Sequence, residues 1–286
     1  MPELPEVTTM VKGLNKTILN QTINDVWTDT EKLIKNMSFL KFKKKLIGQK
    51  VISVERKGKI VVIHLSNDLV LYIHPKMTGH PLIGKWKLID GHWKAMQKGD
   101  LEDPMNRFIH VIFFLDKKMF AFSDLRKFGR IELWEEKDNP SIVSKLGIDA
   151  LDIQLKDFKE ILKTTRKIKQ VLMDQEKVAG IGNIYADEIL FKSRIHPFRK
   201  SNSLTEPEIK RIFNAIKPIL KLSVDKGGSS VSDFRGIDGS KGSFQTLTKV
   251  YNHEGEKCYR CKGTVHRIKM GSRSCYYCPE CQKLTE

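Results

Sequence analysis

Two pairs of cysteines near the C-terminus carry the most specific chemical signal in the sequence. Cys258 and Cys261 form one Cys-x2-Cys pair, and Cys278 and Cys281 form a second pair after sixteen intervening residues. Each pair places two thiolates on one side of a tight turn, and two such turns complete a tetrahedral shell around zinc. Because four cysteines leave no coordination position open, we expect one structural Zn²⁺ rather than a catalytic metal.

The segment around these cysteines is also basic. Lys or Arg residues and a histidine lie between the two pairs, namely Lys262, His266, Arg267, Lys269 and Arg273. A basic β-hairpin held by zinc would be a rigid arm for phosphate groups, although a module that binds another protein is the alternative. The fifth cysteine, Cys275, is interpreted as a bystander because Cys278 gives the better spacing. Crowding of all five cysteines here favours metal binding in a reducing compartment.

A second reactive group is the amine of Pro2. Loss of Met1 would leave a free secondary amine, which is a nucleophile when unprotonated. The positive end of a helix starting here would disfavour the ammonium form, and Glu3 could shuttle protons. Attack of such an amine on a sugar C1′ gives an iminium, which acidifies the C2′ proton and promotes strand cleavage. Taken alone, however, these residues favour the simpler interpretation that proline merely starts a helix.

Charge is strongly unbalanced, with 51 Lys and Arg against 34 Asp and Glu, a net charge of +17 and a pI near 9.6. Such an excess favours polyanionic partners, chiefly nucleic acid. An anionic membrane surface and an ordinary lysine-rich surface stay open on charge alone. No apolar run approaches the roughly 20 residues of a membrane span. The first residues also lack the pattern of a secretory signal, so we expect a cytoplasmic protein.

The first half of the chain is predicted to be rich in strands. Apolar residues from Val7 to Ile18 recur at helical spacing, so one helix begins near the N-terminus. Short β-rich stretches follow, separated by turn sequences such as Lys57-Gly58-Lys59; they cover residues 51–56, 60–65, 69–73, 109–115, 119–122 and 130–134. This spacing indicates a sandwich or barrel, and residues 81–107 are expected to be a loop.

The pattern changes near residues 135–140 and becomes helical. The expected helices cover residues 157–162, 168–173, 184–191 and 206–222. Residues 225–243 contain five glycines and five serines, which predicts a long mobile loop of a kind that is often functional. The cysteine segment completes the chain from about residue 250.

Three motifs together resemble the Fpg/Nei family of DNA glycosylases/AP lyases: Met1-Pro-Glu-Leu-Pro-Glu-Val7, Gly180-Ile-Gly-Asn-Ile-Tyr-Ala-Asp-Glu188 and the four-cysteine ribbon. The resemblance runs over essentially the whole chain, in order. It implies an α+β multi-domain protein with a structural Zn²⁺. Its parts would be an N-terminal catalytic β-sandwich (1–134), a linker (135–150), a helix–two-turn–helix domain (151–249) with a lesion-capping loop (about 227–244), and a zinc-finger β-hairpin (250–286).

The resemblance also implies catalytic roles. Pro2 would be the Schiff-base nucleophile, Glu3 the general acid/base, and Glu6 a supporting residue. Lys59, the last lysine of a hairpin turn, would assist β-elimination, and Arg273 would bind the lesion's phosphates and aid the second elimination. Without the family, Lys59 reads as an ordinary solvated hairpin lysine.

DNA contacts are implied in four places. The segment His74–Gly79 is similar to a loop that inserts a methionine, here Met77, into the base stack. Asp124–Gly129 would supply Arg126 and Phe128, which fill the gap left by an extrahelical base, and Lys127 as a further DNA contact. The alternative is that Met77 and Phe128 are core residues.

The other two places lie in the helical part. Arg166 and Lys169 occupy positions where the family has basic contacts. Asn183 and Tyr185 fall at the start of a helix whose backbone N–H groups can meet a phosphate. Without the family, the neighbouring glycines read as an ordinary helix-linking turn about as well.

Substrate preference is predicted from the glycine- and serine-rich segment, which resembles a loop that caps 8-oxoguanine. With Leu4, it favours excision of oxidised purines from damaged duplex DNA by a monomer. The alternatives are a preference for oxidised pyrimidines and a non-catalytic DNA-binding relative. Departures from the family pattern, at Thr8, Phe108, Leu125 and Cys275, remove no catalytic group but put opposite-base preference in doubt.

Overall fold

The computed structural model describes residues 1–284 and divides the chain into two compact units. The N-terminal unit consists of Met1–Ser144 together with Lys226–Ser243, and the C-terminal unit contains Lys145–Asp225 and the described residues from Phe244 onward. From the sequence, residues 227–244 are expected to belong to the helical domain that they follow. In the structure, nearly all of that segment packs with the N-terminal unit instead, because its hydrogen bonds are made to residues of that unit.

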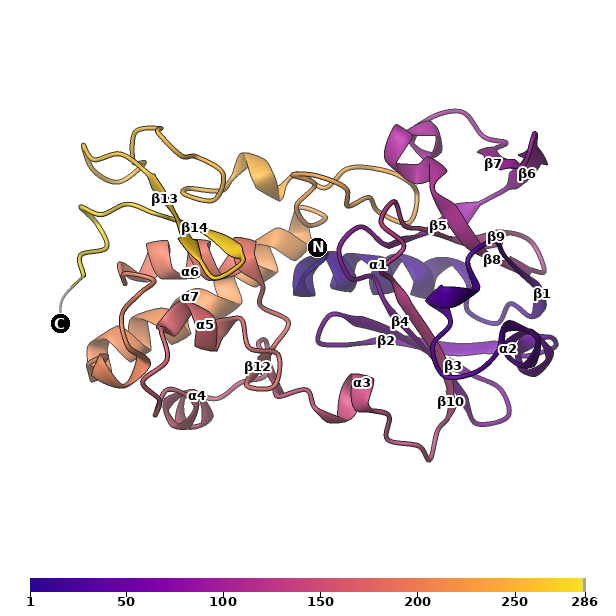
Figure 1. Cartoon of the computed structure of the whole chain (residues 1–286), viewed down its shortest axis with the longest axis horizontal. Coiled ribbons are helices and arrows are strands. Elements are labelled where there is room, and N and C mark those ends of the chain that lie inside the picture. The colour runs from indigo at the N-terminus through magenta and orange to yellow at the C-terminus, as the bar shows by residue number, and fades with distance from the viewer. Residues whose placement is uncertain (285–286) are drawn as a thin grey trace. The chain divides into compact units, whose positions relative to one another are not determined.

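The N-terminal unit is a β-sandwich of two four-stranded antiparallel sheets (Figure 1). One sheet has the order β1 (Ile23–Thr28), β8 (Ile109–Leu115), β9 (Met119–Ser123) and β5 (His80–Gly84). The other has the order β10 (Arg130–Glu135), β4 (Leu69–His74), β3 (Ile60–Leu65) and β2 (Val51–Lys57). Phe113 and Phe120 of the first sheet share one core with Ile63 and Leu71 of the second. The predicted sandwich is therefore confirmed.

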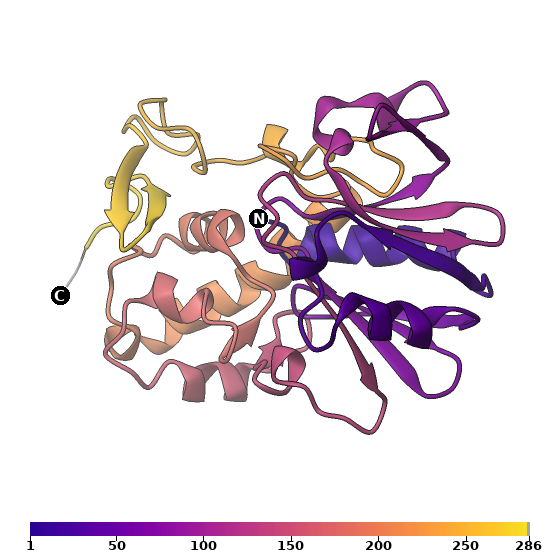
Figure 2. The same cartoon turned by 45° about the vertical axis from the view of Figure 1, so that its right-hand side comes forward.

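Helix α1 (Leu4–Thr17) lies along this sandwich and packs on strands of both sheets (Figure 2). Its fully buried residues Val7, Met10 and Leu14 follow the helical spacing expected from the sequence. A second helix, α2 (Phe39–Leu46), buries Phe42 in the same core. The packing of α1 fixes the position of the chain's first residues.

The turn between β2 and β3 is the tight hairpin that the sequence predicts. Lys57 pairs with Ile60, which leaves only Gly58 and Lys59 in the turn. Gly58 has a φ of 56°, a left-handed value that a two-residue hairpin turn needs at its first central position. The turn thereby places Lys59 at the end of the sheet.

The expectation of a loop over residues 81–107 is wrong in large part. The region holds most of β5, a hairpin of β6 (Trp86–Ile89) and β7 (His92–Ala95), and the short 3₁₀ helices η2 (Asp100–Glu102) and η3 (Pro104–Arg107). The rings of Trp93 and Trp27 meet edge-on at 5.2 Å. Such aromatic packing stabilises short strands that have no clear alternation in the sequence.

The C-terminal unit is helical, as predicted, and ends in a β-hairpin. Its elements are β11 (Ile148–Asp149), α4 (Leu155–Ile161), α5 (Ile168–Leu172), β12 (Val178–Ala179), α6 (Asn183–Ser193), α7 (Glu206–Asp225), β13 (His266–Met270) and β14 (Arg273–Tyr277). Helix α3 (Ser141–Ser144) closes the N-terminal unit. Among residues 1–284, no helix has both the length and the apolar composition to cross a membrane.

Candidate functional site

The four predicted metal ligands meet at one point of the C-terminal unit. Their sulfur atoms all lie within 4.8 Å of one another, with 3.8 Å between Cys258 and Cys281 and 3.6 Å between Cys261 and Cys278. Tetrahedral zinc with bonds of about 2.3 Å requires sulfur–sulfur distances of about 3.8 Å. The four thiolates therefore hold one structural Zn²⁺, and the predicted cofactor is confirmed. Cys275 is outside this cluster, as predicted.

A buried ion pair ties the zinc ribbon to the helices. The Lys169 ammonium lies 2.7 Å from Asp187 Oδ1 and 2.9 Å from the carbonyl oxygen of Ser274. Asp187 also accepts a hydrogen bond of 3.0 Å from the Tyr276 amide. Burial raises the pKa of Asp187 to about 6, and the nearby Lys169 opposes that rise. Helices α5 and α6 are thus joined to strand β14.

Lys169 therefore has a structural role that the sequence did not predict. Its side chain is only 1% exposed and is paired with Asp187, although it also lines the hollow described next. Tyr185 has a structural role as well, because its ring is fully buried and its hydroxyl lies 2.5 Å from Ser223 Oγ. Sequence spacing could not show these contacts, because Asp187 and Ser223 lie far along the chain from Lys169 and Tyr185. The DNA contacts expected of these two residues stay predictions.

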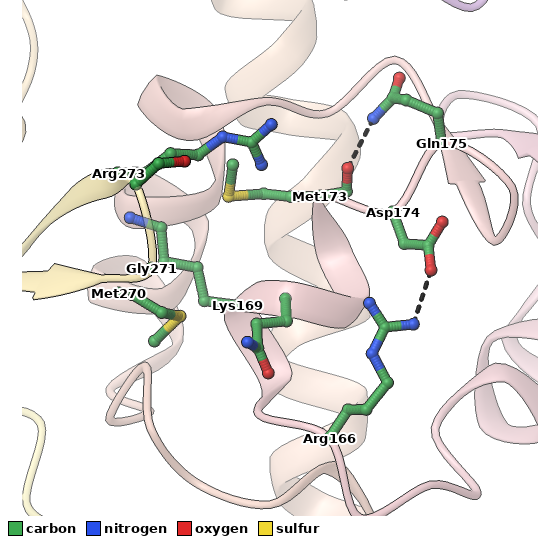
Figure 3. A pocket seen from close by; sticks show the side chains of 10 residues that line it. Arg166, Lys169, Met173, Asp174, Gln175, Met270, Gly271 and Arg273 are labelled. Carbon is green, nitrogen blue, oxygen red and sulfur yellow. Dashed lines mark hydrogen bonds and ion pairs between the residues drawn. The ribbon is translucent and has the colours of Figure 1, made fainter.

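Arg273 and Arg166 line one hollow of about 450 Å³ in the C-terminal unit (Figure 3). Arg273 is the first residue of β14, and Arg166 precedes α5. Arg166 bonds to Asp174 at 2.6 Å, whereas Arg273 has no ion-pair partner among the described residues. The structure thus brings these two predicted residues together, with one positive charge still available for an anion.

Next to this hollow, the turn before α6 is held by Gln175. Its side chain accepts a hydrogen bond of 2.9 Å from the Gly180 amide and donates one of 2.8 Å to the Ile181 carbonyl. Gly180 has a φ of 107°, a conformation that favours glycine. Helix α6 then begins at Asn183, whose side-chain oxygen is buried without a hydrogen-bond partner among the described residues. The first N–H groups of a helix are suitable donors for an anion.

In the N-terminal unit, Glu6 joins the start of the chain to the segment 226–243. Its carboxylate accepts one hydrogen bond of 2.8 Å from the Glu3 amide and one of 2.7 Å from the Ser229 amide. Gly228 has a φ of 83°, and a Cβ there would lie 3.0 Å from the Glu6 side chain. Pro2, Glu3 and Glu6 are all buried. The segment can approach Glu6 this closely because it carries glycine.

A row of basic residues lies at the end of the second sheet. His74 pairs with Arg130 across β4 and β10, and Lys59 is close enough to influence the His74 ring. Burial first, and then the charges of Lys76, Lys59 and Arg130, lower the pKa of His74 to about 3. His74 is therefore neutral at physiological pH. Lys59 is buried as well, so it is not an ordinary solvated lysine.

The loops that carry Met77 and Phe128 are exposed and are joined to each other. Asp124 accepts hydrogen bonds from the Thr78 hydroxyl and, at 2.7 Å, from the Gly129 amide. Met77 is 40% exposed and Phe128 is 52% exposed, which excludes the alternative that they are core residues.

The second of these loops contains a cation–π stack and a residue with a left-handed backbone. The Arg126 guanidinium lies 4.7 Å from the centre of the Phe128 ring. Lys127 between them has a left-handed φ of 54° and is half-buried. Together the two loops present an arginine–aromatic stack and a methionine at the surface. Both motifs are visible in the sequence, but the link between them, from Thr78 to Asp124, is not.

The fold and these sites define a class of protein, in which a β-sandwich bearing buried acidic residues at the start of the chain is combined with a helical unit and a zinc ribbon. Residues 1–131 match the formamidopyrimidine-DNA glycosylase N-terminal domain, 146–235 match the H2TH domain of the same glycosylases, and 255–284 match a zinc finger found in FPG and IleRS. The chain belongs to the formamidopyrimidine-DNA glycosylase family.

Individual relatives agree over the full length. Formamidopyrimidine-DNA glycosylases of Carboxydothermus hydrogenoformans and Pelotomaculum thermopropionicum are each 37% identical, with 99% of this chain and 100% of each relative covered. Among solved structures, a Lactococcus lactis Fpg mutant bound to Fapy-dG-containing DNA has a TM-score of 0.86 at 30% identity, covering 99% of this chain and 100% of its own. The complex of Lactococcus lactis Fpg with abasic-site DNA has a TM-score of 0.85 at 31% identity, with the same coverage.

Proposed function

We propose that this protein is a bifunctional DNA glycosylase/AP lyase of base excision repair that removes oxidised purines from duplex DNA. Membership of the family supports the reaction class. The observation that carries the proposal is the Glu6 carboxylate, which holds the backbone of Glu3 and of Ser229 at once. A residue next to the nucleophile and the segment expected to cap the damaged base are thereby part of one site.

In this proposal the reactive group is the Pro2 amine, freed by removal of Met1. Pro2 is buried two residues before α1, where the positive end of the helix favours the neutral amine. Its nitrogen attacks C1′ of the damaged nucleotide and loses its proton, while the bond between C1′ and the base breaks and the departing base takes up a proton. The C1′–O4′ bond of the sugar then opens and O4′ takes up a proton, which leaves the Pro2 nitrogen and C1′ joined as an iminium. Glu3 would move protons in these steps.

The iminium then permits strand cleavage. It acidifies C2′, so that loss of the C2′ proton expels the 3′ phosphate, and a second elimination expels the 5′ phosphate. Lys59 is assigned to the first elimination, since it is buried in the sandwich and beside the neutral His74. Arg273 is assigned to the phosphates of the second elimination.

Binding of the DNA backbone is assigned to the C-terminal unit. Arg273, Arg166 and the start of α6 at Asn183 offer a guanidinium and backbone N–H groups to phosphates. The structural Zn²⁺ keeps the hairpin that carries Arg273 folded. We infer that a monomer acts on damaged double-stranded DNA in the bacterial cytoplasm, in association with the nucleoid, in line with the bacterial relatives.

Recognition of the lesion is assigned to the N-terminal unit. Met77, Arg126 and Phe128 are exposed on joined loops and have the shapes needed to fill the gap that an extrahelical base leaves. Lys127 would contact the nearby backbone, and residues 226–243 would cover the extruded base. A preference for oxidised pyrimidines is the second candidate, because one structural neighbour is a wild-type Lactococcus lactis Fpg in complex with DNA containing an oxidised pyrimidine.

Borohydride trapping tests the proposal. The protein should form a covalent complex with duplex DNA containing 8-oxoguanine or an abasic site, and Pro2→Gly or an N-terminal extension should abolish it. Trapping that survives both changes would exclude Pro2 as the nucleophile. Comparing the nicking of 8-oxoguanine and thymine-glycol duplexes decides between the two substrate candidates.

A further inference from the structure

A buried chain of hydrogen bonds in the N-terminal unit runs from the segment 226–243 toward the loops that carry Met77 and Phe128. At one end, the Asn106 amide nitrogen donates to the carbonyl of Gly239 at 3.4 Å and to that of Asp100 at 2.8 Å. The Asn106 oxygen therefore faces away from these carbonyls, and it lies 3.0 Å from His80 Nε2.

The chain continues from His80 to the exposed loops. His80 Nδ1 lies 3.1 Å from the carbonyl oxygen of Thr78, the residue that follows Met77. The Thr78 hydroxyl donates to Asp124, and the same hydroxyl accepts a hydrogen bond of 3.1 Å from the Arg126 amide. Asn106, His80, Thr78 and Asp124 are all buried. None of these four residues is predicted from the sequence to be functional.

His80 gives the chain two hydrogen-bonding states. Both of its ring nitrogens face oxygen acceptors, Thr78 O and Asn106 Oδ1. A neutral imidazole has one N–H, so it donates to one acceptor or to the other but not to both. Burial lowers the pKa of His80 and favours this neutral form, although the hydrogen bonds to Thr78 and Asn106 oppose that shift. A shift of the tautomer thus strengthens one end of the chain at the expense of the other.

The segment 226–243 is firmly attached near Asn106, where this series of hydrogen bonds begins. Arg235 pairs with Asp103 at 3.1 Å, and the Ile237 carbonyl accepts a hydrogen bond of 2.7 Å from the Ile83 amide. Gly239 packs so closely that a Cβ there would lie 2.5 Å from the Asp100 carbonyl oxygen. A movement of the segment therefore moves the turn of residues 100–107, which contains Asn106.

We propose that the Asn106–His80 pair is a positioning element that couples placement of residues 226–243 over an extruded base to placement of Met77, Arg126 and Phe128 in the DNA gap. The inference rests on the proposed function and deepens it. Neither His80 nor Asn106 touches the reacting atoms. Excision of a damaged base needs both events, whereas cleavage at an existing abasic site has no base to cover. Loss of the pair should therefore affect excision selectively.

The test compares single-turnover rates on an 8-oxoguanine duplex and on an abasic-site duplex. His80→Phe and Asn106→Leu keep the approximate shape of each side chain but leave buried partners unbonded, so each should slow excision about tenfold or more. Abasic-site cleavage should stay within about twofold of the parent. Because both residues act in one chain, the double variant should be no slower than the slower single variant.

Ser123→Ala is the matched control. It removes a partly buried hydrogen bond of 3.1 Å to the Met105 carbonyl, in the same region but outside this series of hydrogen bonds, so both rates should be unchanged. Equal losses on both substrates, no loss on either, or additive losses would overturn the coupling. If His80→Phe does not fold, Asn106→Asp decides, since it keeps the oxygen facing His80 and loses the donor to Gly239. A parent protein inactive on both duplexes would instead contradict the proposed function.

Discussion

The two units position their functional groups by different means. In the C-terminal unit, Arg273 lies on a hairpin that is held by the four clustered cysteines and by the buried Lys169–Asp187 ion pair. In the N-terminal unit, the exposed residues Met77 and Phe128 are held by hydrogen bonds around Asp124. We infer from this difference that the C-terminal unit is the more rigid support, whereas the hydrogen-bonded loops of the N-terminal unit can adjust.

Removing the metal should have the largest effect. A chelator or Cys258→Ser should unfold the ribbon and release Arg273, and DNA affinity should fall by about a hundredfold or more. The sandwich should keep its own thermal transition, because none of its described elements depends on the metal. Zinc content, DNA titration and calorimetry measure these outcomes. Cys275→Ala is the control and should keep its zinc. If the sandwich unfolded together with the ribbon, the two units would not be stabilised independently.

Breaking the buried Lys169–Asp187 ion pair should have the second largest effect. Asp187→Asn leaves the buried Lys169 ammonium without a counter-charge and should lower the free energy of unfolding by about 3–5 kcal/mol. Denaturant unfolding measures the change. Asp174→Asn is the matched control, since the Arg166–Asp174 pair is much more exposed and should contribute about 0–1 kcal/mol. Similar losses in both variants would contradict the importance assigned to burial.

Acidification should weaken the sandwich through His74. The folded state holds the ring neutral with its pKa lowered to about 3, whereas the unfolded state binds a proton below about 6.5. Stability is therefore lost as the pH falls from 6.5. Relative to His74→Gln, the parent should lose roughly 2 kcal/mol between pH 6.5 and pH 5. Urea unfolding at several pH values measures this difference, and parallel curves for the two proteins would exclude the effect.

The smallest expected change concerns the joined loops. Thr78→Val removes the hydroxyl that bonds Asp124 and the Arg126 amide, and should cost about 1–2 kcal/mol of stability. Excision of the damaged base should slow, while affinity for undamaged DNA stays the same. Thr9→Val is the control, because its hydroxyl donates to the carbonyl of Pro5 within α1 and to no other group among the described residues. If Thr9→Val lost as much stability as Thr78→Val, the Thr78 hydroxyl would have no special role in joining the loops.

The sequence could predict the features that depend on local pattern. The spacing of the zinc cysteines, the hairpin at Gly58 and the apolar face of α1 all follow from residues close together in the chain. The burial of Lys169 could not be predicted this way, because it depends on Asp187 and on strand β14 far along the chain.

The same reason explains the two regions that were misplaced. Residues 226–243 follow α7 in sequence, yet Glu6 and Asp103 draw them to the other unit. Residues 81–107 form strands because Trp93 packs on Trp27, a contact without local periodicity. Asp124 lies within a recognised motif, but its bond to Thr78 spans a distance along the chain that no spacing rule predicts.

The most direct measurement is the identity of the residue that becomes bonded to DNA. The reduced covalent complex with an 8-oxoguanine duplex should be digested and the modified peptide sequenced by mass spectrometry. Our account predicts an adduct on a peptide that begins at Pro2 and lacks Met1. An adduct on Lys59 or another lysine, or an active protein that still carries Met1, would contradict it.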